Sequence, residues 1–182
     1  MKIKGILISF LVLVTFLGFL PIEKASASVS SDSVNEVGDR IDTSKNYYIT
    51  PADSPTRGLS SQNSFNFLPS LVVSSRSNTV EKPSGIPMKL HFSEENQKYR
   101  IGMPYTMPPK MELSYLWVSS YLFFGPDKNA AYWTITPVEG GYTLQAEGGY
   151  LDYKEIESPM YGPTTRAYLG KEKVVWKLVP VS

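Results

Sequence analysis

Cysteine is absent from this 182-residue chain, and histidine occurs once. The lack of cysteine excludes a disulfide scaffold, and a lone histidine disfavours a zinc site. Neither sign of charge dominates, since the sequence contains 18 basic and 17 acidic residues. That balance gives no electrostatic basis for binding nucleic acid or an anionic membrane. The sequence also has no phosphate-binding loop and no Gly-x-Ser-x-Gly motif, so we expect no enzymatic activity and no cofactor.

A long apolar run occurs only at the N-terminus. A short basic start precedes the mostly apolar residues 6–22, and Ala25 and Ala27 supply the small side chains that signal peptidase requires. Pro21 within the run disfavours the alternative, a membrane anchor. We therefore expect residues 1–27 to be a signal peptide of the Gram-positive bacterial kind, cleaved after Ala27, and the protein to be secreted. No membrane-spanning segment is expected after cleavage.

The rest of the chain combines short β-forming runs with frequent turns. Residues 28–45 are polar and predict a flexible N-terminal segment, whose last residues could pair as an edge strand. No later segment carries an apolar stripe at the helical period, and 14 prolines and 13 glycines interrupt the aromatic and β-branched runs. These runs predict strands at 47–50, 67–73, 88–92, 98–101, 113–118, 121–124, 132–138, 142–144, 150–153 and 176–181.

Two pairs of aromatic residues recur at one spacing. Trp133 and Trp176 are 43 residues apart, and so are Tyr99 and Tyr142. Two independent anchors with the same spacing indicate an internal repeat. The repeat predicts three units of about four short strands each, at residues 46–97, 98–140 and 141–182. We expect a threefold all-β architecture of about 12 strands, with both tryptophans in its core, because three blades are too few for a propeller.

The third unit contains Gly149-Tyr150-Leu151-Asp152 and closes on Trp176-Lys177-Leu178-Val179-Pro180-Val181. This order of motifs resembles the ricin B-type lectin-like β-trefoil family, with the best match over residues 133–181. The resemblance implies a β-trefoil domain over residues 46–182. It also implies a non-catalytic carbohydrate-binding protein, such as the receptor-binding part of a toxin-like protein, whose partner is a glycan or glycoprotein surface.

The family's sugar site combines an aspartate, an aromatic platform and an Asn-Gln pair. By resemblance, these positions correspond to Asp152, to Tyr168 with Tyr161 nearby, and to Lys173-Val174. A carboxylate can accept two sugar hydroxyls, and a ring can stack on the apolar face of a pyranose. Lys173 can still donate a hydrogen bond but Val174 cannot, so at most one incomplete sugar site is implied. The alternative is that Asp152 caps a hairpin and the two tyrosines cover the barrel flank.

A second interpretation rests on the loop at residues 102–111, Gly-Met-Pro-Tyr-Thr-Met-Pro-Pro-Lys-Met. Its three prolines stiffen the chain, and Met103, Tyr105 and Met107 offer apolar contact close to Lys110. The loop predicts a protein-binding β-trefoil, such as a protease inhibitor, with a protein target as partner. Alternatively, the loop folds over the open mouth of the barrel. A structural or surface-associated protein without a soluble ligand is a third interpretation.

Overall fold

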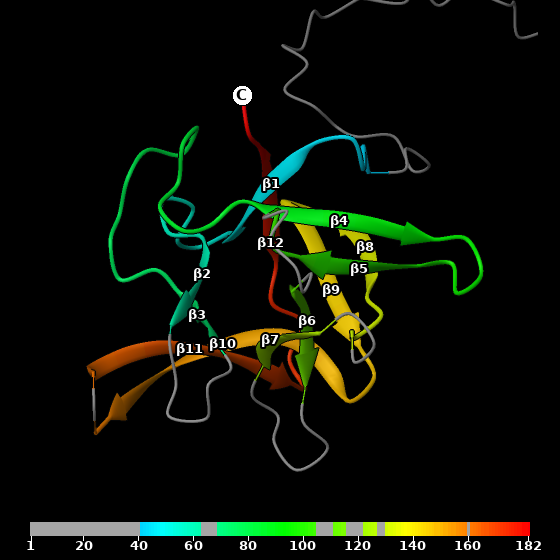
Figure 1. Ribbon diagram of the computed structural model, residues 1–182. Coiled ribbons are helices and arrows are strands. Elements are labelled where there is room, and N and C mark those ends of the chain that lie inside the picture. Colours follow the sequence, from blue (N-terminus) through cyan, green and yellow to red (C-terminus); the bar gives the residue numbers. More distant parts are fainter. Residues whose placement is uncertain (1–40, 63–68, 105–110, 116–121, 127–129, 160) are drawn as a thin grey trace, which may run out of the picture. The chain divides into compact units, whose positions relative to one another are not determined.

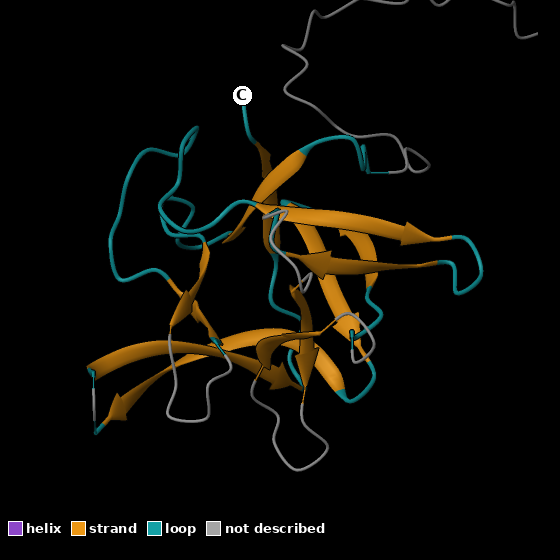
Figure 2. Cartoon of the chain, viewed as in Figure 1, coloured by secondary structure: helices purple, strands orange, loops and turns teal. Residues whose placement is uncertain are grey.

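The computed structural model describes residues 41–62, 69–104, 111–115, 122–126, 130–159 and 161–182, with the backbone alone at 111–115 (Figure 2). All of them belong to one unit, residues 37–182. Within these residues every regular element is a β-strand, and no helix could cross a membrane. The predicted signal peptide and residues 28–40 lie outside the described residues and stay predictions.

Six antiparallel strands close into a ring (Figure 1). They are β1 (Asn46–Pro51), β4 (Met88–Ser93), β5 (Lys98–Gly102), β8 (Thr134–Val138), β9 (Gly141–Ala146) and β12 (Trp176–Pro180). Strand β1 pairs with β4 and β12, β4 pairs with β5, and β9 pairs with β8 and β12. A bridge between Tyr99 and Trp133 closes the ring between β5 and the start of β8. Such closure removes the exposed edges that would otherwise promote aggregation.

The other six strands form three hairpins, of which β2–β3 lies to the left of the ring in Figure 1 and the other two lie in the lower part of the view. They are β2 (Leu59–Gln62) with β3 (Ser70–Val73), β6 (Met111–Tyr115) with β7 (Leu122–Pro126), and β10 (Gly149–Ser158) with β11 (Gly162–Gly170). Strand β3 joins the hairpins, because Ser70 pairs with Phe123 of β7 and Val72 pairs with Arg166 of β11. Each consecutive group of four strands thus supplies two ring strands and one hairpin. This arrangement is a β-trefoil, and the predicted all-β fold of about 12 strands is confirmed.

Strands β2 and β11 have no counterpart among the strands predicted from the sequence. Strand β2 reads Leu-Ser-Ser-Gln, and only Leu59 is buried. It forms because it pairs along its whole length with β3, whose four residues are all buried. Strand β11 begins and ends on glycine and contains Pro163, yet it pairs with β10 from Gly162 to Gly170. In both cases tertiary pairing overrides weak local propensity.

Residues 41–45 form a turn and not the predicted edge strand. The backbone N–H of Ser44 donates to Asp42 Oδ1 at 3.0 Å, and the Tyr47 hydroxyl donates to the carbonyl of Asp42 at 2.9 Å. The aspartate side chain satisfies backbone groups locally, so no neighbouring strand is needed here.

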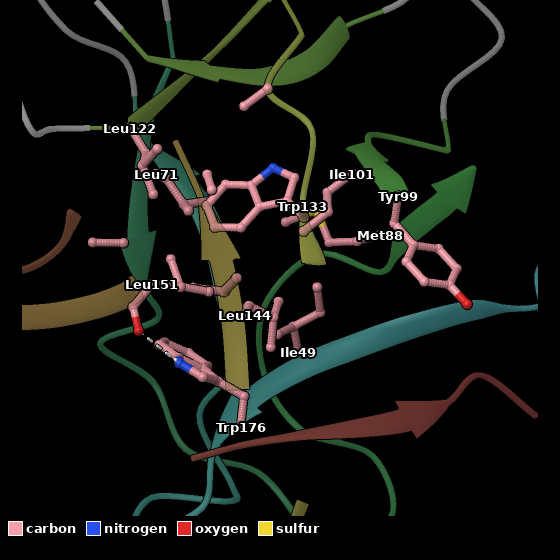
Figure 3. Packing of buried hydrophobic residues seen from close by; sticks show 14 of the residues in the cluster. Ile49, Leu71, Met88, Tyr99, Ile101, Leu122, Trp133, Leu144, Leu151 and Trp176 are labelled. Carbon is pink, nitrogen blue, oxygen red and sulfur yellow. Dashed lines mark hydrogen bonds between the residues drawn. The ribbon is translucent and has the colours of Figure 1, made fainter. Parts of the chain in front are cut away.

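Equivalent positions of the three units meet in the core (Figure 3). The first ring strand of each unit supplies an aliphatic residue, and the closing position supplies a larger side chain. All six are fully buried: Ile49, Ile101 and Leu144 with Met88, Trp133 and Trp176. Burial of a large apolar side chain contributes about 1.5–3 kcal/mol. The predicted core position of the two tryptophans is confirmed.

Candidate functional site

The residues predicted to bind sugar lie on or close to the β10–β11 hairpin. Its register places Asp152 opposite Tyr168. The two strands approach closely at Gly149, whose φ is 154° and where a Cβ would lie 2.4 Å from the carbonyl oxygen of Gly170. Because only glycine fits this approach, the turn at Gly148-Gly149 helps to set the register that brings Asp152 and Tyr168 together.

Both oxygens of the Asp152 carboxylate are bonded within the hairpin. Oδ1 accepts the backbone N–H of Tyr153 at 2.7 Å, and Oδ2 accepts the hydroxyl of Tyr168 at 2.6 Å. The side chain is 9% exposed, and a Cβ added at Gly170 would lie 2.4 Å from Oδ2. Hydrogen bonds to a charged acceptor belong to the stronger class. The geometry therefore favours a carboxylate that holds the hairpin, and its sugar-binding role stays a prediction.

Lysine side chains cover two tyrosine rings of the same hairpin. Lys154 Nζ lies 4.8 Å from the ring centroid of Tyr168, and Lys173 Nζ lies 5.6 Å from the ring centroid of Tyr150. Exposed cation–π pairs of this kind contribute about 0.5–1 kcal/mol. A sugar stacking on that side of Tyr168 would first have to displace Lys154. Val174, which stands where the resemblance expects an amide, packs against the core.

Tyr161 does not join Asp152 and Tyr168. It stands at the tip of the hairpin, where Ser158 pairs with Gly162, six positions along the ladder from Asp152. Six residues of extended strand span about 20 Å. The ring is 44% exposed and lines a different surface. The four predicted sugar-binding residues therefore do not form one site.

The surface next to Tyr161 is an open cavity of about 610 Å³. It forms where the tip of hairpin β10–β11 faces the β2–β3 hairpin and the chain that follows β3. The lining residues are Ser60, Ser61, Gln62, Val72, Val73, Ser74, Ser75, Arg76, Ser77, Asn78, Ser84, Gly85, Tyr161, Pro163, Thr164 and Thr165. Sequence reasoning missed this cavity. Its only signal is short serine runs that lie about one hundred residues from Tyr161 in the sequence.

Arg57 links two segments that line this cavity, the chain after β3 and strand β11. Its Nε donates to the carbonyl of Ser74 at 2.6 Å, and its Nη2 donates to the hydroxyl of Thr165 at 3.1 Å. A second arginine links β11 to β3: Arg166 Nη2 donates to the hydroxyl of Ser70 at 3.1 Å. The two arginines thus hold hairpin β10–β11 against β3, so the cavity has walls that are fixed relative to each other.

A side-chain hydrogen bond joins hairpin β10–β11 to the loop after β1. The hydroxyl of Tyr153 lies 2.6 and 2.7 Å from the two carboxylate oxygens of Asp53. The Tyr153 ring packs edge-on against Trp176, with centroids 5.6 Å apart. Burial, and then the hydrogen bond to Asp53, raise the pKa of the Tyr153 hydroxyl well above its ordinary value of 10.0. The tyrosine therefore stays protonated and donates to the carboxylate.

The loop at residues 102–111 is fixed at both ends, because Gly102 of β5 pairs with Glu112 of β6. Met103 is partly buried and packs against the core, so its side chain anchors the loop more than it extends the predicted contact surface. Tyr105, Met107 and Lys110 lie outside the described residues, and their contact roles stay predictions.

Among the described residues, no group of three or more acidic or histidine side chains is arranged to hold a metal ion. No protein-family model matches the sequence, and no curated protein matches it.

Solved structures do share the fold. The water-soluble chlorophyll protein from Brassica oleracea var. botrytis, solved with chlorophyll b, superposes with a TM-score of 0.55 at 16% identity and covers 76% of this chain and 91% of its own. Soybean trypsin inhibitor gives a TM-score of 0.53 at 16% identity, with 76% and 92% covered. The rice bifunctional α-amylase/subtilisin inhibitor gives 0.50 at 18% identity, with 78% and 94% covered.

Identities this low establish the fold alone. The similarity to trypsin inhibitors of the Kunitz type and to the chlorophyll protein supports a β-trefoil. It does not support membership of the ricin B-type lectin family specifically. The expectation from sequence is therefore correct at the level of the fold and unsupported at the level of the family.

Proposed function

We propose that this protein is a non-catalytic β-trefoil that binds a protein partner, and specifically a protease inhibitor that presents the loop at residues 102–111. The observation that carries the proposal is the pairing of Gly102 with Glu112. This pairing holds the two ends of the loop side by side, one on ring strand β5 and the other on β6 of the β6–β7 hairpin. A loop whose ends are fixed on a rigid scaffold loses little conformational entropy when a partner binds.

The composition of the loop suits an inhibitor. Pro104, Pro108 and Pro109 restrict the backbone before binding, which lowers the entropy lost in the complex. Lys110 has the chemistry of a side chain that enters the acidic primary pocket of a trypsin-like protease. Met107 has the chemistry for an apolar pocket of the chymotrypsin or subtilisin kind. The loop therefore offers two candidate anchor residues of different specificity.

The engagement of Asp152 and Tyr168 supports a protein partner over a sugar at the family-type position. A sugar would have to compete with the Tyr168 hydroxyl and the Tyr153 N–H for both carboxylate oxygens. Two similar solved structures are named as inhibitors, one of trypsin and one of α-amylase and subtilisin. These names describe those proteins, and they make proteases the first partners to test for this chain.

The test is an inhibition assay with the chain from Ser28 onward against trypsin, chymotrypsin and subtilisin. We expect at least one protease to be inhibited. Lys110→Ala should weaken trypsin inhibition at least tenfold, or Met107→Ala should weaken inhibition of the other two. The matched control is Glu95→Ala, in the exposed turn between β4 and β5. No inhibition of any of the three proteases, or equal loss in the control, would refute the inhibitor assignment.

We also propose that the protein is secreted after cleavage behind Ala27. The basic start, the apolar residues 6–22 and the small residues before Ser28 support this proposal. Expression of the whole chain in a Gram-positive host, followed by mass spectrometry of the culture medium, tests it. The expected product begins at Ser28. An uncleaved chain retained by the cells would refute the proposal.

A further inference from the structure

The cavity beside Tyr161 lies where hairpin β10–β11 extends beyond its pairing with β3 of the β2–β3 hairpin. Strand β11 pairs with β3 at Arg166 and Val72, whereas its pairing with β10 continues to Gly162. The first residues of β11 therefore extend past β3 and leave a space beside the chain after β3. The volume of about 610 Å³ lies within the range of about 300–1,000 Å³ that is usual for ligand pockets.

Hydrogen bonds fix the chain that forms the walls of the cavity. Besides the two bonds of Arg57, the backbone N–H of Asn78 donates to the carbonyl of Thr56 at 3.1 Å. The hydroxyl of Ser84 donates to the carbonyl of Arg76. The backbone N–H of Arg76 is in turn 3.3 Å from the hydroxyl of Ser74. These bonds fix the backbone of the chain after β3, so a ligand meets preorganised groups.

The chemistry of the lining selects a polar ligand. Twelve of the sixteen described lining residues carry a hydroxyl, amide or guanidinium group, and most of these groups are neutral and can both donate and accept. Val72 and Val73 are among the apolar lining residues, but they are 8% and 3% exposed and offer little surface. Among the lining residues that the structure describes, Arg76 is the one charged side chain and none carries a carboxylate. The cavity therefore favours a hydroxyl-rich ligand that carries a negative charge.

Tyr161 adds an aromatic face to this polar cavity. Tyr161 is 44% exposed and stands among the exposed large hydrophobic residues of the described chain. An exposed aromatic ring attracts the apolar C–H face of a pyranose, and neutral donor–acceptor groups match its hydroxyls. Protein–protein interfaces, in contrast, are poor in serine and place apolar or aromatic anchors at their centre. The lining thus fits a saccharide better than a polypeptide.

We propose that this cavity binds an acidic saccharide. The sugar ring stacks on Tyr161, its hydroxyls bond to the serine, threonine and amide side chains of the walls, and its carboxylate pairs with the guanidinium of Arg76. This site differs from the Asp152–Tyr168 position implied by resemblance. None of its described lining residues belongs to residues 102–111.

The test is an array of uronic-acid, sialylated and neutral glycans probed with the chain from Ser28 onward, followed by titration of the strongest glycan. We expect carboxylated glycans to bind more tightly than their neutral counterparts. Arg76→Gln should weaken the carboxylated glycan at least tenfold and change the neutral one little. Tyr161→Ala should weaken both, and Tyr161→Phe should restore both, because the ring and not the hydroxyl is required.

Two variants serve as matched controls. Lys82→Gln removes an exposed cation outside the lining, and Tyr132→Ala removes a tyrosine that is 39% exposed elsewhere. Both should bind as the unchanged chain does. Absence of glycan binding, equal losses in the controls, or binding that requires Asp152 instead of Arg76 would overturn the proposal. Protease inhibition measured on Arg76→Gln and Tyr161→Ala should stay unchanged, so failure of this site and failure of the inhibitor assignment are separable.

Discussion

Replacement of Tyr168 by phenylalanine removes one hydroxyl and leaves the ring in place. That hydroxyl donates to Asp152 Oδ2 at 2.6 Å, and Asp152 is buried, with 9% of the residue exposed. A hydrogen bond to a charged group contributes about 1.5–3 kcal/mol, and the remaining carboxylate would be buried with one donor fewer. We expect Tyr168→Phe to lower the free energy of unfolding by about 2 kcal/mol. For a chain of this size the melting temperature would fall by about 4–8 °C.

A double-mutant cycle isolates the pair from the rest of the hairpin. Asp152→Ala also leaves the backbone N–H of Tyr153 without its acceptor, so this single change should destabilise more than Tyr168→Phe. The coupling energy between the two positions should be about 1–2 kcal/mol. Asp152→Asn is the control that keeps the shape and removes the charge. Urea unfolding followed by the fluorescence of the buried Trp133 and Trp176 measures all four variants.

One result would refute this reasoning. If Tyr168→Phe and Asp152→Ala each change the free energy of unfolding by less than about 0.5 kcal/mol, the carboxylate does not hold the hairpin. Loss of glycan binding in the same variants at unchanged stability would instead assign Asp152 to a sugar site.

Three further predictions concern the core and the hairpin. Trp176→Phe should destabilise by about 1–3 kcal/mol more than Trp133→Phe in urea unfolding, because only the Trp176 indole N–H has a hydrogen-bond partner among the described residues, a backbone carbonyl at 3.0 Å. Equal losses would contradict this. The pKa of Tyr153 is raised mainly by burial, so its stabilising contribution is complete below the ordinary pKa of 10.0 and is lost as pH rises through the higher folded value. Denaturant titrations above pH 10 should show stability falling more steeply in the unchanged chain than in Tyr153→Phe. Gly170→Ala should lower the melting temperature, since its Cβ would lie 2.4 Å from Asp152 Oδ2, and the loss should shrink in an Asp152→Ala background.

The fold could be predicted because its evidence is periodic. The two 43-residue spacings mark equivalent positions of three similar units, and the aromatic and aliphatic residues at these positions must be buried together. The structure places the closing Met88, Trp133 and Trp176 at full burial, as the repeat requires. Strand β2 could not be predicted, because its polar sequence becomes a strand only through pairing with β3.

The contacts of the candidate site residues could be predicted less well from the sequence, because they depend on which side chains meet in the fold, and the binding roles of these residues stay predictions. Asp152 and Tyr168 are adjacent as expected, but they bond to each other. The sequence suggested that Tyr161 lies near Tyr168, but it lies at the tip of the hairpin, six positions along the ladder from Asp152. The serines that share a cavity with it come from a different unit and carry no motif.

The sequence by itself determined the class of secondary structure, the threefold repeat and the identity of the core tryptophans. These properties follow from local propensity and from the spacing of apolar residues, which the chain carries in any conformation. Only the tertiary structure decided the partners of individual polar groups. The Asp152 carboxylate accepts from Tyr168 of the neighbouring strand, and Arg57 bonds to both Ser74 of the first unit and Thr165 of the third. Such pairings depend on distances between strands far apart in the chain, which spacing along one chain does not encode.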